Sequence, residues 1–233
     1  MKENISVLVV DDEYKISEAV SAYLKSKGYT VFTAETGSAA LRIFNEQKVD
    51  FVILDLMLPD VSGEEICSRI RKVSAVPVIM LTAKSQEEDV LKGLELGADD
   101  YVVKPFSIKQ LCARMEAIMR RTAESVKPTA AVYSWNNGDL KADFQTMEIR
   151  KNGKEVYLTS SEWKILSALV KHPQMVFTRE KLIEIAFGDD FDSFDRAIDT
   201  HVKNLRKKIE TDTKNPQYIL TVRGSGYKFG GKI

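Results

Sequence analysis

The chain has few of the side chains on which several common kinds of protein depend. Its 233 residues include only two cysteines, Cys67 and Cys112, each inside an amphipathic helical pattern, so we expect a reducing compartment and no disulfide framework. The two histidines, His172 and His201, provide little material for a zinc site or a histidine-based relay, and we expect His201 to be packed within its domain. These shortages exclude disulfide-rich scaffolds and disfavour zinc proteins.

Long apolar segments are also missing. No stretch approaches the roughly 20 apolar residues of a membrane span, and the opening Met-Lys-Glu-Asn lacks the apolar core of a signal peptide. We therefore expect a soluble, cytoplasmic protein that does not contact a membrane.

The net charge is zero, but the charges are unevenly distributed. Residues 1–122 carry 16 basic and 19 acidic side chains, whereas the remainder carries 18 and 15. Residues 196–232 alone have nine basic and three acidic side chains. This local excess predicts a polyanionic partner for the C-terminal end, although a solvated charged face would have the same composition.

The length suits two domains. Residues 1–121 alternate short apolar runs with segments of helical periodicity, which predicts an α/β domain with a doubly wound, five-stranded parallel sheet. Residues 122–129 are short and polar and indicate a linker. Residues 130–233 combine hairpin signals such as Asn152-Gly153 with three helical patterns, so we expect a smaller α+β domain there. The strands of the first domain are expected at residues 6–10, 30–34, 51–54, 78–81 and 101–103.

Polar side chains follow four of the expected parallel strands. Asp11, Asp12, Asp55, Thr82 and Lys104 would converge on one edge of the sheet, where ligands bind in such folds. Three carboxylates held together repel one another, so the cluster indicates a divalent cation beside a nucleophilic carboxylate. The pattern therefore predicts phosphoryl chemistry on Asp55.

Each residue of this edge has a distinct expected task. Asp55 would form an acyl phosphate, while Asp11, Asp12, Asp55 and the backbone carbonyl of Met57 would hold Mg2+. Lys104 and Thr82 would contact the phosphoryl oxygens, with a cis bond to Pro105 aiming Lys104 inward. An aspartate after a strand also commonly caps the next helix, which is the alternative for any one of these positions.

Two other functions are alternatives for the first domain. An aspartyl-phosphate phosphatase would place an acid two residues after its nucleophile, where this chain has Met57. A flavin or nucleotide binder needs a glycine- or hydroxyl-rich phosphate cradle, whereas the first strand is followed by Asp11, Asp12 and Glu13.

The motifs VVDDE, ILDLMLPDVSG, LTAK and GADDYVVKPF make residues 1–121 similar to the receiver domain of a bacterial two-component response regulator. The resemblance implies that a sensor histidine kinase phosphorylates Asp55 and that Thr82 and Tyr101 move together to report it. It also implies no enzymatic turnover beyond reactions of the protein's own acyl phosphate. Tyr101 alone would otherwise be an ordinary half-buried strand aromatic.

The third helical pattern of the second domain, about residues 195–210, has one apolar face. Its other face is basic and polar, as in a helix that reads the DNA major groove, although most amphipathic helices look similar. The stretches LTSSEWKIL, RAIDTHVKNLRKKIE and TVRGSGYKF resemble the winged-helix domain of OmpR/PhoB-type regulators. The apolar positions are Ile198, Val202, Leu205 and Ile209.

This resemblance implies binding to double-stranded DNA at repeated half-sites. A domain that contacts only RNA polymerase or another protein is the alternative. The side chains expected at bases or phosphates are Thr200, Lys203, Asn204 and Lys207, and those expected at phosphates are Arg196, Arg206 and Arg223.

The resemblance further implies a homodimer of the phosphorylated protein, held by ion pairs between receivers. Gln110 stands where an acidic partner for Lys92 is usual, so one of these pairs would be at best a neutral hydrogen bond; rim pairs contribute only about 0 to 1 kcal/mol. The residues expected on this dimer surface are Lys92, Asp99, Asp100, Gln110, Arg114 and Arg120.

Overall fold

The computed structural model describes residues 5–83, 96–124, 132–188 and 197–232. They divide into two compact units, Met1–Met119 and Arg120–Ile233. Helix α5 (Ile108–Glu124) runs past this division and includes the first residues of the segment expected to be a linker.

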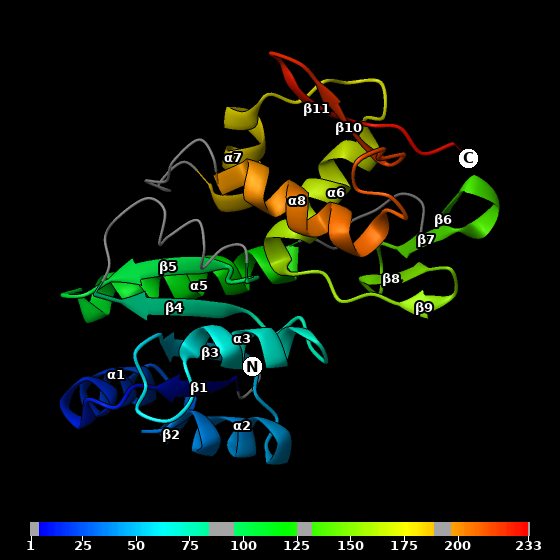
Figure 1. Ribbon diagram of the computed structural model, residues 1–233. Coiled ribbons are helices and arrows are strands. Elements are labelled where there is room, and N and C mark those ends of the chain that lie inside the picture. Colours follow the sequence, from blue (N-terminus) through cyan, green and yellow to red (C-terminus); the bar gives the residue numbers. More distant parts are fainter. Residues whose placement is uncertain (1–4, 84–95, 125–131, 189–196, 233) are drawn as a thin grey trace. The chain divides into compact units, whose positions relative to one another are not determined.

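The first unit contains a five-stranded parallel sheet in the order β2-β1-β3-β4-β5, which confirms the predicted fold (Figure 1). Its strands are short and nearly all apolar, as expected for a sheet covered on both faces. The strands are β1 (Ser6–Val10), β2 (Thr30–Ala34), β3 (Phe51–Asp55), β4 (Val78–Thr82) and β5 (Asp100–Val103), and the other helices are α1 (Tyr14–Ser26), α2 (Gly37–Glu46) and α3 (Gly63–Arg71).

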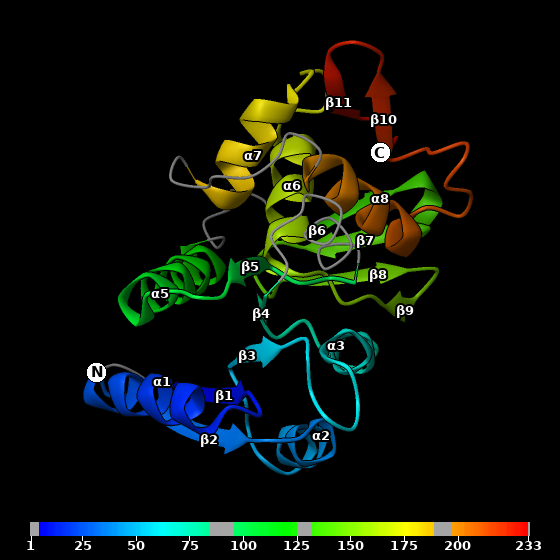
Figure 2. The ribbon, with the colours of Figure 1, turned by 60° about the vertical axis from the view of Figure 1, so that its left-hand side comes forward.

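Helices cover both faces of this sheet. Alternate residues of the strands pack against α1 and α5 on one face and against α2 and α3 on the other (Figure 2). Cys112 lies in the first of these two cores and Cys67 in the second; both are buried, and they do not form a disulfide. The doubly wound arrangement brings the carboxyl ends of β1, β3, β4 and β5 to one edge.

Its described residues give the second unit a four-stranded antiparallel sheet, three helices and a C-terminal hairpin. Asn152 and Gly153 join β8 to β9 with φ values of 50° and 77°, the left-handed geometry that the Asn-Gly pair predicts for a tight hairpin. The elements are β6 (Val132–Trp135), the 3-10 turn η1 (Asn136–Gly138), β7 (Leu140–Asp143), β8 (Glu148–Lys151), β9 (Lys154–Glu155), α6 (Ser160–Lys171), α7 (Arg179–Phe187), α8 (Ala197–Ile209), β10 (Ile219–Val222) and β11 (Gly226–Phe229).

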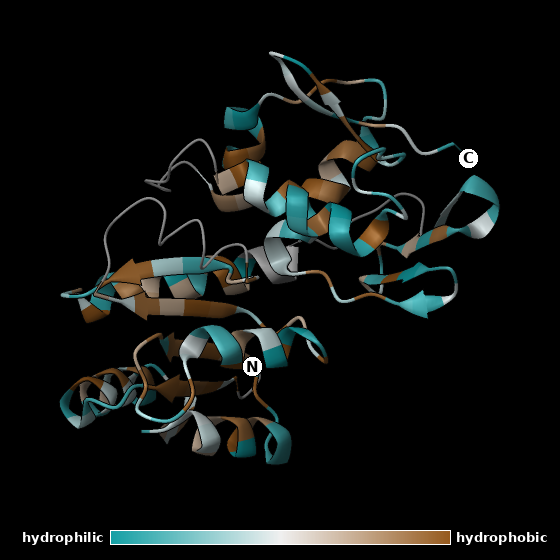
Figure 3. Ribbon diagram, in the orientation of Figure 1, coloured by the Kyte–Doolittle hydropathy of each residue, from teal (hydrophilic) through white to brown (hydrophobic). Residues whose placement is uncertain are grey.

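One apolar core joins the sheet, the helices and the hairpin of the second unit. Both tryptophans of the chain, Trp135 and Trp163, lie in it and are almost completely buried. The predicted apolar row of α8 is also buried, and Figure 3 shows apolar and polar residues alternating along this helix. Among the described residues, no helix is long and apolar enough to cross a membrane.

Candidate functional site

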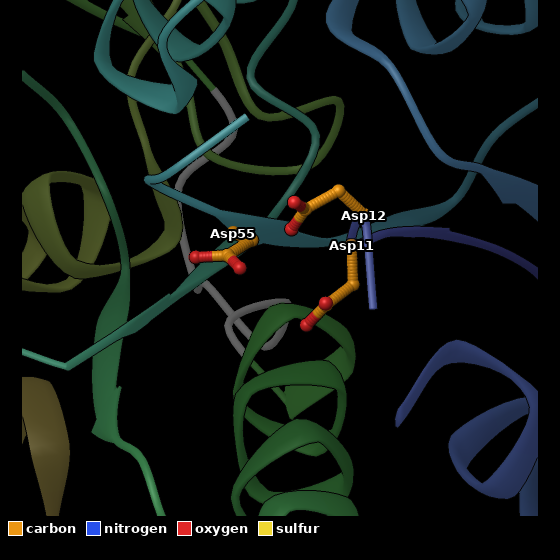
Figure 4. Close-up of side chains that lie close together, drawn as sticks. All are labelled: Asp11, Asp12 and Asp55. Atoms are coloured by element: carbon orange, nitrogen blue, oxygen red, sulfur yellow. The ribbon is translucent and has the colours of Figure 1, made fainter. Parts of the chain in front are cut away.

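Three aspartates meet at the carboxyl edge of the parallel sheet. Asp11 and Asp12 follow β1 and Asp55 ends β3, and one carboxylate oxygen of each lies within 4.8 Å of the others (Figure 4). Asp11 and Asp55 are buried, whereas Asp12 is exposed. The structure thus brings together the three carboxylates that the strand pattern predicted.

Lys104 places its ammonium group among these carboxylates. Its Nζ lies 2.6 Å from Asp55 Oδ2, 2.8 Å from Asp11 Oδ2 and 3.3 Å from Glu13 Oε1. Burial lowers the pKa of Lys104, but hydrogen bonds to Asp11 and Asp55 outweigh it and raise that pKa above its usual value. The lysine therefore stays charged. The Lys104–Pro105 peptide bond is cis, as expected.

Backbone N–H groups fix the orientation of the two buried carboxylates. Met57 N–H donates to Asp55 Oδ1 at 3.1 Å, and Glu13 N–H donates to Asp11 Oδ1 at 2.9 Å. Each aspartate therefore holds one oxygen against its own loop and turns the other toward the centre of the cluster.

The donor set fits a small, hard cation. Asp11 Oδ2 is buried, and its close partner among the described residues is the Lys104 ammonium, 2.8 Å away. Burial raises the pKa of Asp11, while Lys104 and the Glu13 N–H partly oppose that rise. Two buried carboxylates beside an exposed third one provide the oxygen ligands that Mg2+ prefers in proteins.

Thr82 and Tyr101 lie on the neighbouring strands. Met80 pairs with Tyr101 and Thr82 pairs with Val103, so Thr82 and Tyr101 project from the same face of the sheet. Thr82 is only 1% exposed and Tyr101 8%. Both side chains therefore lie on the face covered by α2 and α3. Thr82 is one strand away from Asp55, and Tyr101 is two strands away.

The loop after Asp55 is held by contacts that the sequence did not reveal. Asp60 accepts hydrogen bonds from the N–H groups of Gly37 and Ser38, at 2.7 and 2.9 Å, and from the Ser38 hydroxyl at 2.6 Å. A Cβ on Gly63 would lie 2.2 Å from the carbonyl oxygen of Asp55. The Leu-Pro-Asp turn and the glycine were the available signals, because both commonly fix tight loops.

The expected dimer surface requires a correction. Asp99 is 1% exposed and pairs with Arg71 of its own chain, whose Nη2 lies 2.9 Å away, so it is not available at an open surface. Asp100 pairs within the chain too, with Arg114 Nη1 at 3.0 Å. These two aspartates stabilise the receiver fold.

Two of the remaining dimer-surface residues, Gln110 and Arg120, are exposed on α5. Lys92, the expected partner of Gln110, lies outside the described residues.

The residues expected to contact DNA differ in their exposure. Lys203 and Lys207 are exposed on α8, whereas Thr200 and Asn204 are only 7% and 5% exposed. Thr200 and Asn204 are thus buried, not open to solvent as expected. Contact with DNA bases would require both side chains to become accessible. Arg196 lies outside the described residues.

Arg206 has an internal role that the sequence did not predict. Its Nε and Nη2 donate to the carbonyl oxygen of Ile219, at 3.0 and 2.6 Å, and Nη2 also donates to Thr221 Oγ1 at 2.8 Å. The guanidinium lies over the ring of Tyr227. Arg206 thus links α8 to the hairpin, and its contact with a DNA phosphate stays a prediction; Arg223 is exposed.

His201 is a core residue, as predicted. It is 1% exposed and lies 5.0 Å, between ring centroids, from Phe187. Burial, with a smaller effect of the Lys208 charge, lowers its pKa to about 4. The imidazole is therefore neutral near pH 7.

An acidic edge on a doubly wound sheet, followed by a domain with helices and a C-terminal hairpin, is typical of two-domain DNA-binding response regulators. Residues 7–116 match the family described as the response regulator receiver domain, and residues 153–229 match the family described as transcriptional regulatory protein, C terminal. The chain belongs to the OmpR/PhoB-type response regulators of two-component systems.

Full-length relatives agree with this assignment. The chain is 41% identical over 224 residues to the DNA-binding response regulator MtrA of Mycolicibacterium smegmatis, covering 96% of each chain. It is 40% identical over 226 residues to the sensory transduction protein RegX3 of the same organism, covering 97% of this chain and 99% of RegX3. The crystal structure of Thermotoga maritima DrrB, an OmpR/PhoB homologue, aligns with a TM-score of 0.52 and 39% identity over 98% of this chain and 100% of DrrB.

Proposed function

We propose that this protein is a transcription regulator whose DNA binding depends on phosphorylation of Asp55 by a sensor histidine kinase. The observation that carries the proposal is the contact between Asp55 and Lys104 at the buried acidic edge. Asp55 attacks the phosphorus atom of the donor, and a new bond to its carboxylate oxygen forms as the bond to the donor breaks. The product is an acyl phosphate on Asp55.

The surrounding residues position this transfer. Asp11, Asp12, Asp55 and the Met57 carbonyl are the proposed ligands of Mg2+, which supplies positive charge to the phosphoryl oxygens when bound. Lys104 presents a second positive charge to the same oxygens, and Thr82 donates its hydroxyl to one of them. Tyr101, on the same face of the sheet as Thr82, then responds to the movement of Thr82.

The acyl phosphate is tested with Asp55→Asn and a radiolabelled small phosphodonor, acetyl phosphate, in the presence of Mg2+. The wild-type protein should acquire label that hydroxylamine removes, and the variant should acquire none. Asp12→Asn serves as the comparison, because it keeps the nucleophile and should only raise the Mg2+ concentration needed for half-maximal labelling. Undiminished labelling of Asp55→Asn would show that another residue accepts the phosphate.

The second unit has features that suit DNA binding, the proposed response to phosphorylation of Asp55. We propose that α8 lies in the major groove with Lys203 and Lys207 toward the DNA, and that Arg223 of the hairpin contacts the backbone or minor groove. Phosphorylated receivers pair, so that two second units occupy repeated half-sites. Sedimentation of the full chain before and after phosphorylation tests this step, and an unchanged mass would exclude it.

A further inference from the structure

The loop between β3 and α3, residues 56–62, carries Met57 and is anchored on both sides of that residue. On the first side, Leu56 N–H donates to the carbonyl oxygen of Leu81, and the Leu56 carbonyl accepts the Gly63 N–H, both at 3.1 Å. Met57 itself is 65% exposed, so packing of its side chain does not hold it. The position of the Met57 backbone therefore depends on the two anchors.

Asp60 provides the second anchor by joining this loop to α2. Its Oδ1 accepts the N–H groups of Gly37 and Val61, at 2.7 and 2.8 Å. Its Oδ2 accepts the N–H and the hydroxyl of Ser38, at 2.9 and 2.6 Å. Gly37 and Ser38 are the first residues of α2, where the N–H groups have no acceptor within the helix. The carboxylate therefore bridges segments that lie 22 and 23 residues apart in the chain.

Close packing keeps the loop and the start of α2 in register. A Cβ on buried Gly37 would lie 2.7 Å from the side chain of Ile66 and 2.9 Å from that of Val61, so this end of α2 lies directly against the loop and α3. Hydrogen bonds from the Ser38 hydroxyl and N–H hold the pKa of Asp60 below its usual range, although the carboxyl is exposed. Asp60 is therefore ionised near pH 7 and remains an acceptor for these donors.

We propose that Asp60 is a positioning residue for Mg2+: by tying the loop to α2, it holds the Met57 carbonyl in place as a metal ligand. The inference rests on the proposed function, in which this carbonyl is one ligand of the ion beside Asp55. An ordered ligand binds a metal more tightly, because the ion does not have to order the loop. The carboxylates that meet at the acidic edge are those of Asp11, Asp12 and Asp55, so Asp60 acts through the loop and not as a ligand.

The test measures binding of Mn2+ to the full-length chain in the absence of a phosphodonor. Mn2+ takes the same oxygen ligands as Mg2+, and its electron paramagnetic resonance signal reports the free ion. The variant is Asp60→Ala, and the matched control is Asp212→Ala. Asp212 is also exposed and accepts loop hydrogen bonds, from the Lys214 N–H at 2.9 Å and the Asn215 amide at 2.8 Å, but it belongs to the second unit. Circular dichroism confirms that each variant is folded.

Asp60→Ala should raise the dissociation constant for Mn2+ about tenfold, the lower end of the effect of removing a residue that orients a metal ligand. Asp60→Asn keeps one acceptor oxygen for Gly37 and Val61, so it should raise the constant less than the alanine variant does. If the alanine variant does not fold, the asparagine variant provides the comparison with wild type. The Asp212→Ala control should bind Mn2+ as wild type does.

Salt separates this positioning effect from simple attraction between the Asp60 charge and the ion. In 0.5 M KCl the Debye length is only about 4 Å, so the loss of a more distant charge has little effect there. The difference in Mn2+ affinity between Asp60→Ala and wild type should therefore persist at this salt concentration.

Other results would overturn the inference in distinct ways. A folded Asp60→Ala variant with the wild-type affinity for Mn2+ would show that Asp60 only stabilises the loop. A difference that is present at low salt and disappears at high salt would indicate attraction between charges alone. Wild type that binds Mn2+ but takes no label on Asp55 would reject the proposed phosphorylation and leave the role of Asp60 intact, whereas wild type that binds no Mn2+ would reject both proposals.

Discussion

Buried His201 should make the second unit lose stability in mild acid. The folded-state pKa of His201 is lowered from 6.5 to about 4, so between these values the unfolded chain binds a proton that the folded chain does not. The free energy of unfolding therefore decreases as the pH falls through 6.5, and the decrease levels off only near pH 4. Each pKa unit corresponds to about 1.4 kcal/mol, so between pH 7.5 and pH 5.0 this one side chain should remove about 2 kcal/mol.

The two tryptophans make the measurement specific to this unit. Because Trp135 and Trp163 are the only tryptophans and both lie in its core, urea unfolding followed by tryptophan fluorescence reports the second unit without a receiver signal. His201→Leu should remove the decrease of about 2 kcal/mol in the free energy of unfolding between pH 7.5 and pH 5.0. This holds whether the substitution raises or lowers stability at pH 7.5. His172→Gln, at an exposed position, should leave the wild-type dependence intact. Equal pH dependence in wild type and His201→Leu would refute the assignment of a neutral buried imidazole.

Two further predictions concern the receiver. Arg71→Met leaves the buried Asp99 carboxylate without its cation and should destabilise the unit by about 3 to 5 kcal/mol in thermal or urea unfolding. Arg69→Met breaks only an exposed pair with Glu65 and should cost less than about 1 kcal/mol. Similar losses of stability in the two variants would contradict the importance of the buried pair. Gly63→Ala places a Cβ against the Asp55 carbonyl, so the loop after Asp55 must move. The variant should still fold, but acetyl phosphate should label it more slowly than wild type. A wild-type labelling rate would show that the loop accommodates the Cβ without disturbing Asp55.

Much of the receiver site was predictable because parallel strands end at a common edge. Asp11, Asp55 and Lys104 each follow an apolar run, and the contacts of 2.6 and 2.8 Å from Lys104 to the two aspartates follow from that topology. The apolar row of α8 was predictable for a similar reason, since helical periodicity alone determines which residues face the core.

Contacts between distant parts of the chain were not predictable in this way. Asp99 was expected at a dimer surface, but its partner Arg71 lies 28 residues earlier, on a different element. The resemblance implied only a phosphate contact for Arg206, and its hydrogen bond to a carbonyl 13 residues later in the hairpin was not foreseen. Neither partner is marked by any local pattern, because both result from how separate elements pack.

The two cysteines lie on opposite faces of the receiver sheet, so each can report whether the helices on its own face detach from the sheet. Cys112 belongs to α5 and packs against one face of the sheet, whereas Cys67 belongs to α3 and packs against the other. Burial raises the pKa of Cys112 to about 11, so its thiol reacts slowly with alkylating reagents while the layer above it stays closed. Mass spectrometry that follows the alkylation of each thiol would therefore distinguish transient detachment of one helical layer from detachment of the other and from unfolding of the whole unit.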